Sequence, residues 1–301
     1  MIKVLVTGAS GFIGRQVLPR LVKQGLEVHA LSSKTKLPSD KTIQWHHCDL
    51  FNTSQVTSLF HQLKPRYLLH LAWVTEHGIY WQSAENYCWV QASLYLLNCF
   101  QKNGGERVVS AGSCAEYDWR YGYCVEDVTP CLADNAYASC KISMQSLQQA
   151  FAETHQLSQA WGRIFFLFGS DESPRRLVPY IVNTLLQRQI VTCNDDCLLR
   201  DFLYVEDAAD AFVTLLTSEV QGIVNIASGQ PLAIGELTVK IADSLGQYNK
   251  NMIHFNYHKS EASMVVANTQ KLSEQVNWKP SYSFDEALDK TINWWRHNNE
   301  Y

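Results

Sequence analysis

The sequence predicts an α/β fold built on a doubly wound parallel (Rossmann) sheet, followed by a smaller α/β lobe. Apolar runs typical of strands alternate with helical patterns through the first half of the chain. The first apolar run leads into three glycines spaced by three, and a helical pattern follows them. After Gly169 the alternation breaks, without a linker or repeat. We therefore expect a dinucleotide-binding domain over 1–168 and a substrate-binding lobe over 169–301, with interleaved segments.

Hydrophobic periodicity places the individual elements. In the first half, strands are expected at 3–7, 27–31, 43–47, 67–72, 107–111 and 159–167, and helices at 15–24, 54–63, 84–101 and 136–153. In the second half, helices are expected at 177–187, 205–216, 234–245 and 284–298, and strands at 222–226 and 252–256. Strands and helices that alternate at this spacing form right-handed βαβ units.

The composition excludes several classes of protein. Of 301 residues, 46% are hydrophobic and 18% are charged, and the formal net charge is -4. The chain as a whole lacks the excess of basic residues that nucleic-acid binding favours. No apolar run is long enough to span a membrane. Glycines interrupt the first apolar stretch, which argues against a signal peptide. We expect a cytoplasmic protein.

The nine cysteines contain no C-x-x-C pair. Cys193 and Cys197 could form half of a metal site, but no second ligand pair has matching spacing. We expect reduced thiols and no metal.

The glycine turn is the first candidate binding site. Gly8 permits a tight turn after the strand, Gly11 lets backbone N–H groups approach a pyrophosphate, and Gly14 lets the helix pack close to the sheet. The expected cofactor-binding residues of this turn are Thr7, Gly8, Ser10, Gly11, Phe12, Ile13 and Gly14.

The end of the second strand bears on the choice of cofactor. An NAD site usually has an acid here for the ribose 2′-hydroxyl, whereas this chain has Ser32, Ser33 and Lys34. These residues favour NADP over NAD, with Arg15 as a second cation for the 2′-phosphate; a solvated loop lysine is the alternative interpretation of Lys34. Asp49 is expected to bind the adenine amino group or to end a loop. Further cofactor contacts are expected from Leu50, Leu71 and Ala72.

Tyr137 and Lys141 lie four residues apart on an expected helix and therefore share one face. The tyrosine hydroxyl has an ordinary pKa of about 10, and a nearby ammonium favours the phenolate. Ser113 follows the fifth strand and is expected to donate a hydrogen bond to a substrate oxygen. Ser113, Tyr137 and Lys141 therefore form a candidate catalytic set for alcohol or ketone chemistry. Tyr137 and Lys141 are also expected to contact the cofactor.

These features together resemble the extended short-chain dehydrogenase/reductase family of nucleotide-sugar epimerases, dehydratases and reductases. The resemblance covers nearly the whole chain and rests on 7–14, Asp49, 70–72, Ser113, Tyr137, Lys141, 200–207, 225–229 and 278–280. It implies that Arg200 meets the diphosphate of a nucleotide-sugar substrate. It also implies a homodimer formed through the helices at 84–101 and 136–153.

Departures from the family pattern narrow the expected chemistry. The 4,6-dehydratases have an Asp-Glu pair where this chain has Cys114 and Ala115, so the resemblance argues against dehydration. GDP-fucose synthase has a cysteine two residues before the tyrosine that matches Tyr117, and this chain has Ala115 there. The resemblance therefore implies that the acid/base pair for 3,5-epimerisation is absent. Phe166 and Trp89 occupy positions where relatives often have asparagine.

The remaining substrate contacts are expected from loops near the site. Arg175 and Arg176 are expected to supply phosphate contacts, with a solvated helix start as the alternative. Trp73 and Glu76 follow the fourth strand, in a loop that either selects the sugar or consists of packed aromatics. Glu116 is expected to line the pocket beside Ser113.

The preferred hypothesis is NADPH-dependent reduction of a nucleotide-activated 4-keto-6-deoxyhexose, a step in polysaccharide biosynthesis by family analogy. The first competing hypothesis is a nucleotide-sugar 4-epimerase with tightly bound NAD. Two more hypotheses are a reductase of a non-nucleotide ketone and a non-catalytic dinucleotide-sensing regulator.

Overall fold

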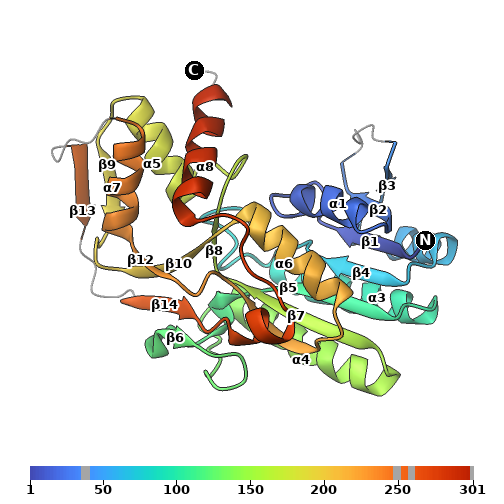
Figure 1. The fold of residues 1–301 in the computed structure, drawn as a ribbon. Helices are drawn as coiled ribbons and strands as arrows, with labels where there is room; N and C mark the ends of the chain where they lie inside the picture. The colour runs from blue at the N-terminus through green and yellow to red at the C-terminus, as the bar shows by residue number, and fades with distance from the viewer. Residues whose placement is uncertain (35–40, 247–251, 257–261, 299–301) are drawn as a thin grey trace.

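A seven-stranded parallel sheet organises the first part of the chain in the computed structural model, which describes residues 1–34, 41–246, 252–256 and 262–298 (Figure 1). The strand order is β11-β7-β5-β4-β1-β2-β3. The strands are β1 (Lys3–Thr7), β2 (Glu27–Ser32), β3 (Ile43–His47), β4 (Tyr67–His70), β5 (Arg107–Ser113), β7 (Ser158–Ile164) and β11 (Gly222–Ile226). The order reverses at β1, so β1 and β4 flank a crevice at their carboxyl ends, where such sheets bind ligands. The expected fold class is confirmed.

Helices cover both faces of this sheet. The helices α1 (Gly14–Lys23) and α6 (Val205–Thr217) pack together on one face (Figure 1). The other face is covered by α2 (Thr53–Leu63), α3 (Glu85–Lys102) and α4 (Ala136–His155). Each layer buries its own apolar cluster against the strands, with Phe212 in one cluster and Phe100 in the other. Burial of these side chains holds the layers together.

The second part of the chain is built on a smaller sheet of order β12-β10-β14-β6, with β8 beside β10. Its strands are β6 (Tyr123–Cys124), β8 (Phe166–Phe168), β10 (Leu199–Tyr204), β12 (Pro231–Ala233) and β14 (Met264–Ala267), and β9 (Val191–Asn194) pairs with β13 (Ile253–Asn256). The helices α5 (Leu177–Leu186), α7 (Ile234–Ser244) and α8 (Phe284–Asn298) share one apolar core beside it. Apart from β13 and the β8 part of the run 159–167, these strands were not expected from the sequence, because most of them are only two to four residues long.

One expected strand is divided in the structure. The apolar run 159–167 enters two sheets: β7 belongs to the main sheet, and β8 pairs with β10 in the smaller one. The chain passes between them at Phe165, whose N–H donates to the Ile226 carbonyl. After β10 the chain returns to the main sheet through α6 and β11, so a single boundary at residue 168 does not separate the two sheets.

No helix among the described residues has both the length and the apolar character needed to cross a membrane.

Candidate active site

The glycine turn between β1 and α1 is tightly packed. Gly8 has φ of +65°, and a Cβ there would lie 2.8 Å from the Ala72 nitrogen. A Cβ on Gly14 would overlap the Gly8 carbonyl oxygen. The Gly11 N–H donates to the same oxygen at 3.0 Å. This cradle, which side chains would fill, fits the pyrophosphate of a dinucleotide at a helix N-terminus.

Thr7 serves the fold and does not face the crevice. Its hydroxyl is completely buried, lies 2.7 Å from His70 Nδ1 and accepts the Ala72 N–H at 3.2 Å. His70 Nε2 lies 2.8 Å from the Ser93 hydroxyl, and burial lowers the pKa of His70 to about 3. A neutral histidine thus ties β1, β4 and α3 together. The Thr7 hydroxyl is thus engaged within the fold, and contact between Thr7 and the cofactor remains a prediction.

The end of β2 presents hydroxyls and a lysine. Ser32 is buried, and its hydroxyl accepts the Lys34 N–H at 3.1 Å. The Ser33 and Lys34 side chains are exposed. Asp49 is exposed and accepts the Phe51 N–H at 3.0 Å, a local turn bond that leaves its second oxygen open to a ligand.

The remaining cofactor candidates divide between the groove and the core. Leu50 is buried in the apolar cluster that contains Phe100, and Phe12 and Ile13 pack partly into the apolar clusters. Ser10, Leu71 and Ala72 are half-buried beside the crevice. Arg15 lies against the glycine turn, where its Nε donates to the Gly11 carbonyl, and it pairs with Asp171. Their contacts with a dinucleotide remain predictions.

The three candidate catalytic residues come together at the carboxyl end of β5. Ser113 ends this strand, and Tyr137 lies in the first turn of α4, which Asn135 caps by accepting the Ala138 N–H at 2.9 Å. A hydrogen bond from Ser113 favours the Tyr137 phenolate, but burial outweighs it and raises the pKa of Tyr137. The Tyr137 hydroxyl therefore keeps its proton at neutral pH.

Lys141 lies one helical turn after Tyr137 and is only 3% exposed. Its ammonium donates to the Ala111 carbonyl at 2.7 Å and lies 3.8 Å from the centroid of the Trp73 ring. Burial lowers the pKa of Lys141 to about 7. The carbonyl and the aromatic face both favour the charged form, which burial disfavours.

An aromatic loop (residues 73–83) packs against Tyr137 and Lys141. Tyr80 and Trp81 contact the Tyr137 ring edge-to-face, at centroid distances of 4.8 Å and 5.7 Å. Asn86, which is fully buried in α3, accepts the Trp73 indole N–H at 2.8 Å and donates to the Tyr80 carbonyl at 2.7 Å. Asn86 was missed from the sequence, because nothing in its spacing links it to Lys141.

The loop after β8 contacts the aromatic loop. Arg175 pairs with Glu76 at 3.2 Å, and Arg176 donates to the Thr75 carbonyl at 3.4 Å. The Arg176 guanidinium also lies 5.5 Å from the Tyr80 ring centroid. Both arginines and Glu76 are thus at the edge of the site, where their contacts with substrate remain predictions.

Two expected substrate residues are buried. Glu116 has no exposed surface, and its carboxylate is occupied by Arg163 and Trp161, so the expectation that Glu116 lines the pocket is wrong. The Arg200 side chain donates to the Leu199 and Ala262 carbonyls and lies 5.7 Å from the Phe166 ring centroid. The Phe166 ring thus lies beside the Arg200 guanidinium. Contact between Arg200 and a diphosphate remains a prediction.

A cavity of about 650 Å³ is lined by residues that contact Tyr137. Trp81 and Ala115, which both contact Tyr137, form part of its wall. Trp119 and Asn135 line it as well. Aromatic faces beside polar groups suit a hydroxylated ring, since such a wall offers both packing and hydrogen bonds.

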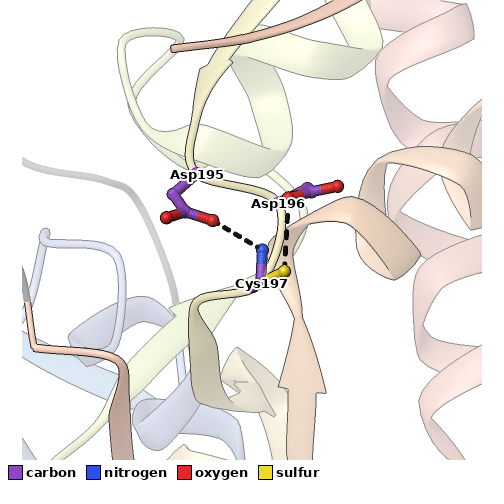
Figure 2. A group of neighbouring side chains, drawn as sticks. All are labelled: Asp195, Asp196 and Cys197. Carbon is purple, nitrogen blue, oxygen red and sulfur yellow. Dashed lines mark hydrogen bonds between the residues drawn. The ribbon is translucent and has the colours of Figure 1, made fainter. Parts of the chain in front are cut away.

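The Cys193–Cys197 segment forms a local turn. Figure 2 shows Asp195 accepting the Cys197 N–H at 2.9 Å, while the Cys197 thiol donates to Asp196 at 3.4 Å. Cys193 is buried in β9, so it does not join this group. The acidic side chains are engaged locally by the turn.

The chain matches the model of the NAD dependent epimerase/dehydratase family over residues 4–227. It is 24% identical to a UDP-glucuronate 4-epimerase of Thermodesulfobacterium geofontis, over 98% of this chain and 97% of that protein. It is also 24% identical to a CDP-abequose synthase of Salmonella typhimurium, over 96% of this chain and 97% of the relative.

Solved structures show the same fold. A UDP-N-acetylglucosamine 4-epimerase from Methanobrevibacter ruminantium superimposes with a TM-score of 0.87 at 22% identity, covering 98% of each chain. A UDP-glucose 4-epimerase of Thermus thermophilus in complex with NAD gives a TM-score of 0.83 at 22% identity, covering 99% of this chain and 100% of that one. With the family model matching most of its length, the chain belongs to the NAD dependent epimerase/dehydratase family of enzymes.

Proposed function

We propose that the protein reduces a nucleotide-activated 4-keto-6-deoxyhexose to the 4-hydroxy sugar, with NADPH as the reductant. The observation that carries this proposal is the arrangement of Ser113, Tyr137 and Lys141, with no carboxylic acid at the two positions that follow Ser113. Cys114 and Ala115 occupy those positions. The first carboxylate after Ser113 in the sequence, Glu116, is buried in an ion pair with Arg163. One proton donor suits carbonyl reduction, whereas dehydration needs an additional acid and base.

The residues around Tyr137 have separable tasks. A dinucleotide held by the glycine turn would supply the hydride that reduction of the ketone at C4 requires. The Tyr137 hydroxyl gives its proton to the oxygen that becomes the alcohol, and its raised pKa keeps it protonated beforehand. Ser113 donates a hydrogen bond to the same oxygen. The Lys141 ammonium stabilises the tyrosinate that remains, until a proton from solvent restores it.

Preference for NADP rests on the end of β2. Ser33 and Lys34 are exposed there, where a 2′-phosphate would need hydroxyl and ammonium donors. No carboxylate occurs within β2 after Glu27 or in the two residues that follow it. An NAD-specific site would place an acid at this position to bind the 2′-hydroxyl.

The substrate class is supported by relatives that act on nucleotide sugars. The CDP-abequose synthase and the UDP-sugar epimerases match this chain over nearly its full length. Arg200 and Arg176 are the proposed partners of the diphosphate, and Trp81 and Trp119 of the sugar. We also propose that the protein forms a homodimer through α3 and α4.

The test is oxidation of NADPH at 340 nm by purified protein, with NADH in parallel. GDP-, dTDP- and CDP-4-keto-6-deoxyhexoses are offered in turn. Turnover with one of them, lost in Tyr137→Phe while NADPH still binds, supports the reductase and identifies its nucleotide. No turnover with any of them, from protein that binds NADPH, contradicts it.

The second candidate is a 4-epimerase, favoured by the similarity to a UDP-glucuronate 4-epimerase. An epimerase would retain NAD through purification and would interconvert UDP-sugars without net oxidation of cofactor. Chromatography of UDP-glucuronate and UDP-glucose after incubation, together with the absorbance of released dinucleotide, separates the two functions.

A further inference from the structure

A buried carboxylate lies directly behind the catalytic serine. Glu116 is the third residue after Ser113, at the end of the short helix Cys114–Glu116, and it has no exposed surface. Its Oε1 accepts the backbone N–H of Ser113 at 2.7 Å, and its Oε2 accepts Nε of Arg163 at 2.7 Å. The indole N–H of Trp161 reaches both oxygens, at 3.0 Å and 3.1 Å.

These contacts are costly features for a protein core. An ion pair without access to water must recover the hydration lost by both charges, and apolar side chains often replace it without loss of stability. Glu116 and Arg163 are each at most 1% exposed. Their position beneath Ser113 therefore calls for an explanation other than stability.

The bonds of Glu116 define the orientation of the serine hydroxyl. Glu116 holds the Ser113 N–H, while the Ser113 Oγ accepts the Ala115 N–H at 3.2 Å. This capping arrangement fixes Ser113 at the start of the short helix. Oγ is held by this backbone hydrogen bond, and the single proton of Ser113, which bonds to Tyr137 here, can turn to a substrate oxygen that lies between the two residues.

The surrounding residues leave this arrangement little freedom. A Cβ on Gly112 would lie 2.6 Å from Glu116 Oε1 and would overlap the Trp161 indole nitrogen. The Trp161 ring centroid lies 5.7 Å from the Lys141 ammonium, and the Glu116 carboxylate raises the pKa of Lys141 against the larger, opposite effect of burial. Arg163 is fixed in turn by the Tyr117 ring, whose centroid lies 4.3 Å from its guanidinium carbon.

We propose that Glu116, paired with Arg163, is a positioning residue that holds Ser113 as a hydrogen-bond donor toward the substrate oxygen. The inference rests on the proposed function in one respect, the role of Ser113 as that donor. Glu116 itself contacts neither substrate nor cofactor. Misplacement of a catalytic group by a fraction of an ångström lowers turnover strongly without a comparable loss of binding.

The principal test is Glu116→Gln. We expect kcat to fall by about tenfold to a hundredfold, with KM and the affinity for NADPH within threefold of wild type. Since Glu116→Gln leaves the Arg163 charge buried without its partner, Glu116→Gln/Arg163→Gln restores the balance of charge and is measured beside it. We expect the same loss of kcat in the double variant. Glu106→Gln, at a half-exposed ion pair with Arg66, is the matched control.

A double-mutant cycle with Ser113→Ala separates positioning from a general effect on the fold. If Glu116 acts through Ser113, Glu116→Gln changes kcat by less than threefold in the Ser113→Ala background. If the fold-loss in kcat of the double variant equals the product of the two single losses, the proposal is overturned. A kcat of Glu116→Gln within twofold of wild type also overturns it.

Amide hydrogen exchange of the peptide containing Ser113 gives a readout independent of the reaction. We expect faster exchange at Ser113 in Glu116→Gln and wild-type exchange in Glu106→Gln. If the wild-type enzyme does not reduce 4-keto sugars, the proposed function fails, and the cycle is repeated with the epimerase reaction. Unchanged exchange at Ser113 in Glu116→Gln overturns the positioning role whichever reaction the enzyme performs.

Discussion

The ammonium of Lys141 lies 3.8 Å from the centroid of the Trp73 ring, inside the site and almost out of contact with water. The aromatic face replaces part of the hydration that burial removes. Trp73 comes from the loop after β4, whereas Lys141 lies on α4. The charge of Lys141 is therefore supported by a residue distant in sequence.

Removing the Trp73 ring should shift the pH dependence of catalysis. A cation–π contact contributes roughly 0.5–2 kcal/mol to the protonated form, so Trp73→Leu should lower the pKa of Lys141. Since the proposed mechanism requires the ammonium, the alkaline limb of kcat/KM should move to lower pH by about 0.4–1.5 pH units. Trp73→Phe, which keeps an aromatic face, should shift the limb less. An alkaline limb at the same pH in Trp73→Leu and wild type would contradict this prediction.

Replacing Lys141 should stabilise the protein while abolishing activity. Burial lowers the pKa of Lys141 from 10.5 to about 7, so between these values the unfolded chain binds the extra proton. The free energy of unfolding therefore rises with pH between about 7 and 10.5. Below pH 7 the folded protein carries the full cost of a buried charged lysine. Lys141→Met should raise Tm by several degrees at pH 6.5, and the increment should shrink toward pH 10. Calorimetry over this range tests it, with Lys23→Met, at an exposed position, as the control. An increment that is constant with pH would show that the lysine is not desolvated as described.

The glycine cradle should not tolerate alanine at position 14. A Cβ there meets the Gly8 carbonyl and the Ala9 backbone, which cannot move without opening the turn. Gly14→Ala should cost about 3 kcal/mol in free energy of unfolding and abolish dinucleotide binding. Gly104→Ala, at φ of +84° with open space around the new atom, should cost only about 1 kcal/mol and leave binding intact. Urea unfolding and fluorescence titration with NADPH measure both effects, and equal costs in the two variants would refute the argument.

Cofactor preference should depend on Lys34. If its ammonium binds a 2′-phosphate, Lys34→Ala should weaken NADPH about tenfold and leave NADH nearly unchanged. Because the side chain is exposed, the variant should unfold like wild type. Isothermal titration with both dinucleotides, at two salt concentrations, provides the measurement. Equal weakening of both, or of neither, would remove the basis for NADP preference.

Local patterns in the sequence were sufficient to predict the dinucleotide fold and to place Tyr137 and Lys141 on one helix as candidates. Glycines at 8, 11 and 14 and the four-residue spacing of Tyr137 and Lys141 are short-range features that the backbone expresses directly. The helix Phe284–Asn298 follows the expected bounds because its apolar stripe has helical periodicity.

The tertiary structure alone decided which polar side chains are accessible. Thr7 and Glu116 are polar residues near the site, and both were expected to meet ligands, yet each bonds a partner more than forty residues away. The division of 159–167 between two sheets and the placement of Trp73 over Lys141 likewise arise from long-range packing. The sequence determined the chemistry available at the ends of the strands, because spacing along one helix or turn is a local property. Only the tertiary structure decided which of these groups face the crevice, because burial and charge pairing depend on contacts between distant segments.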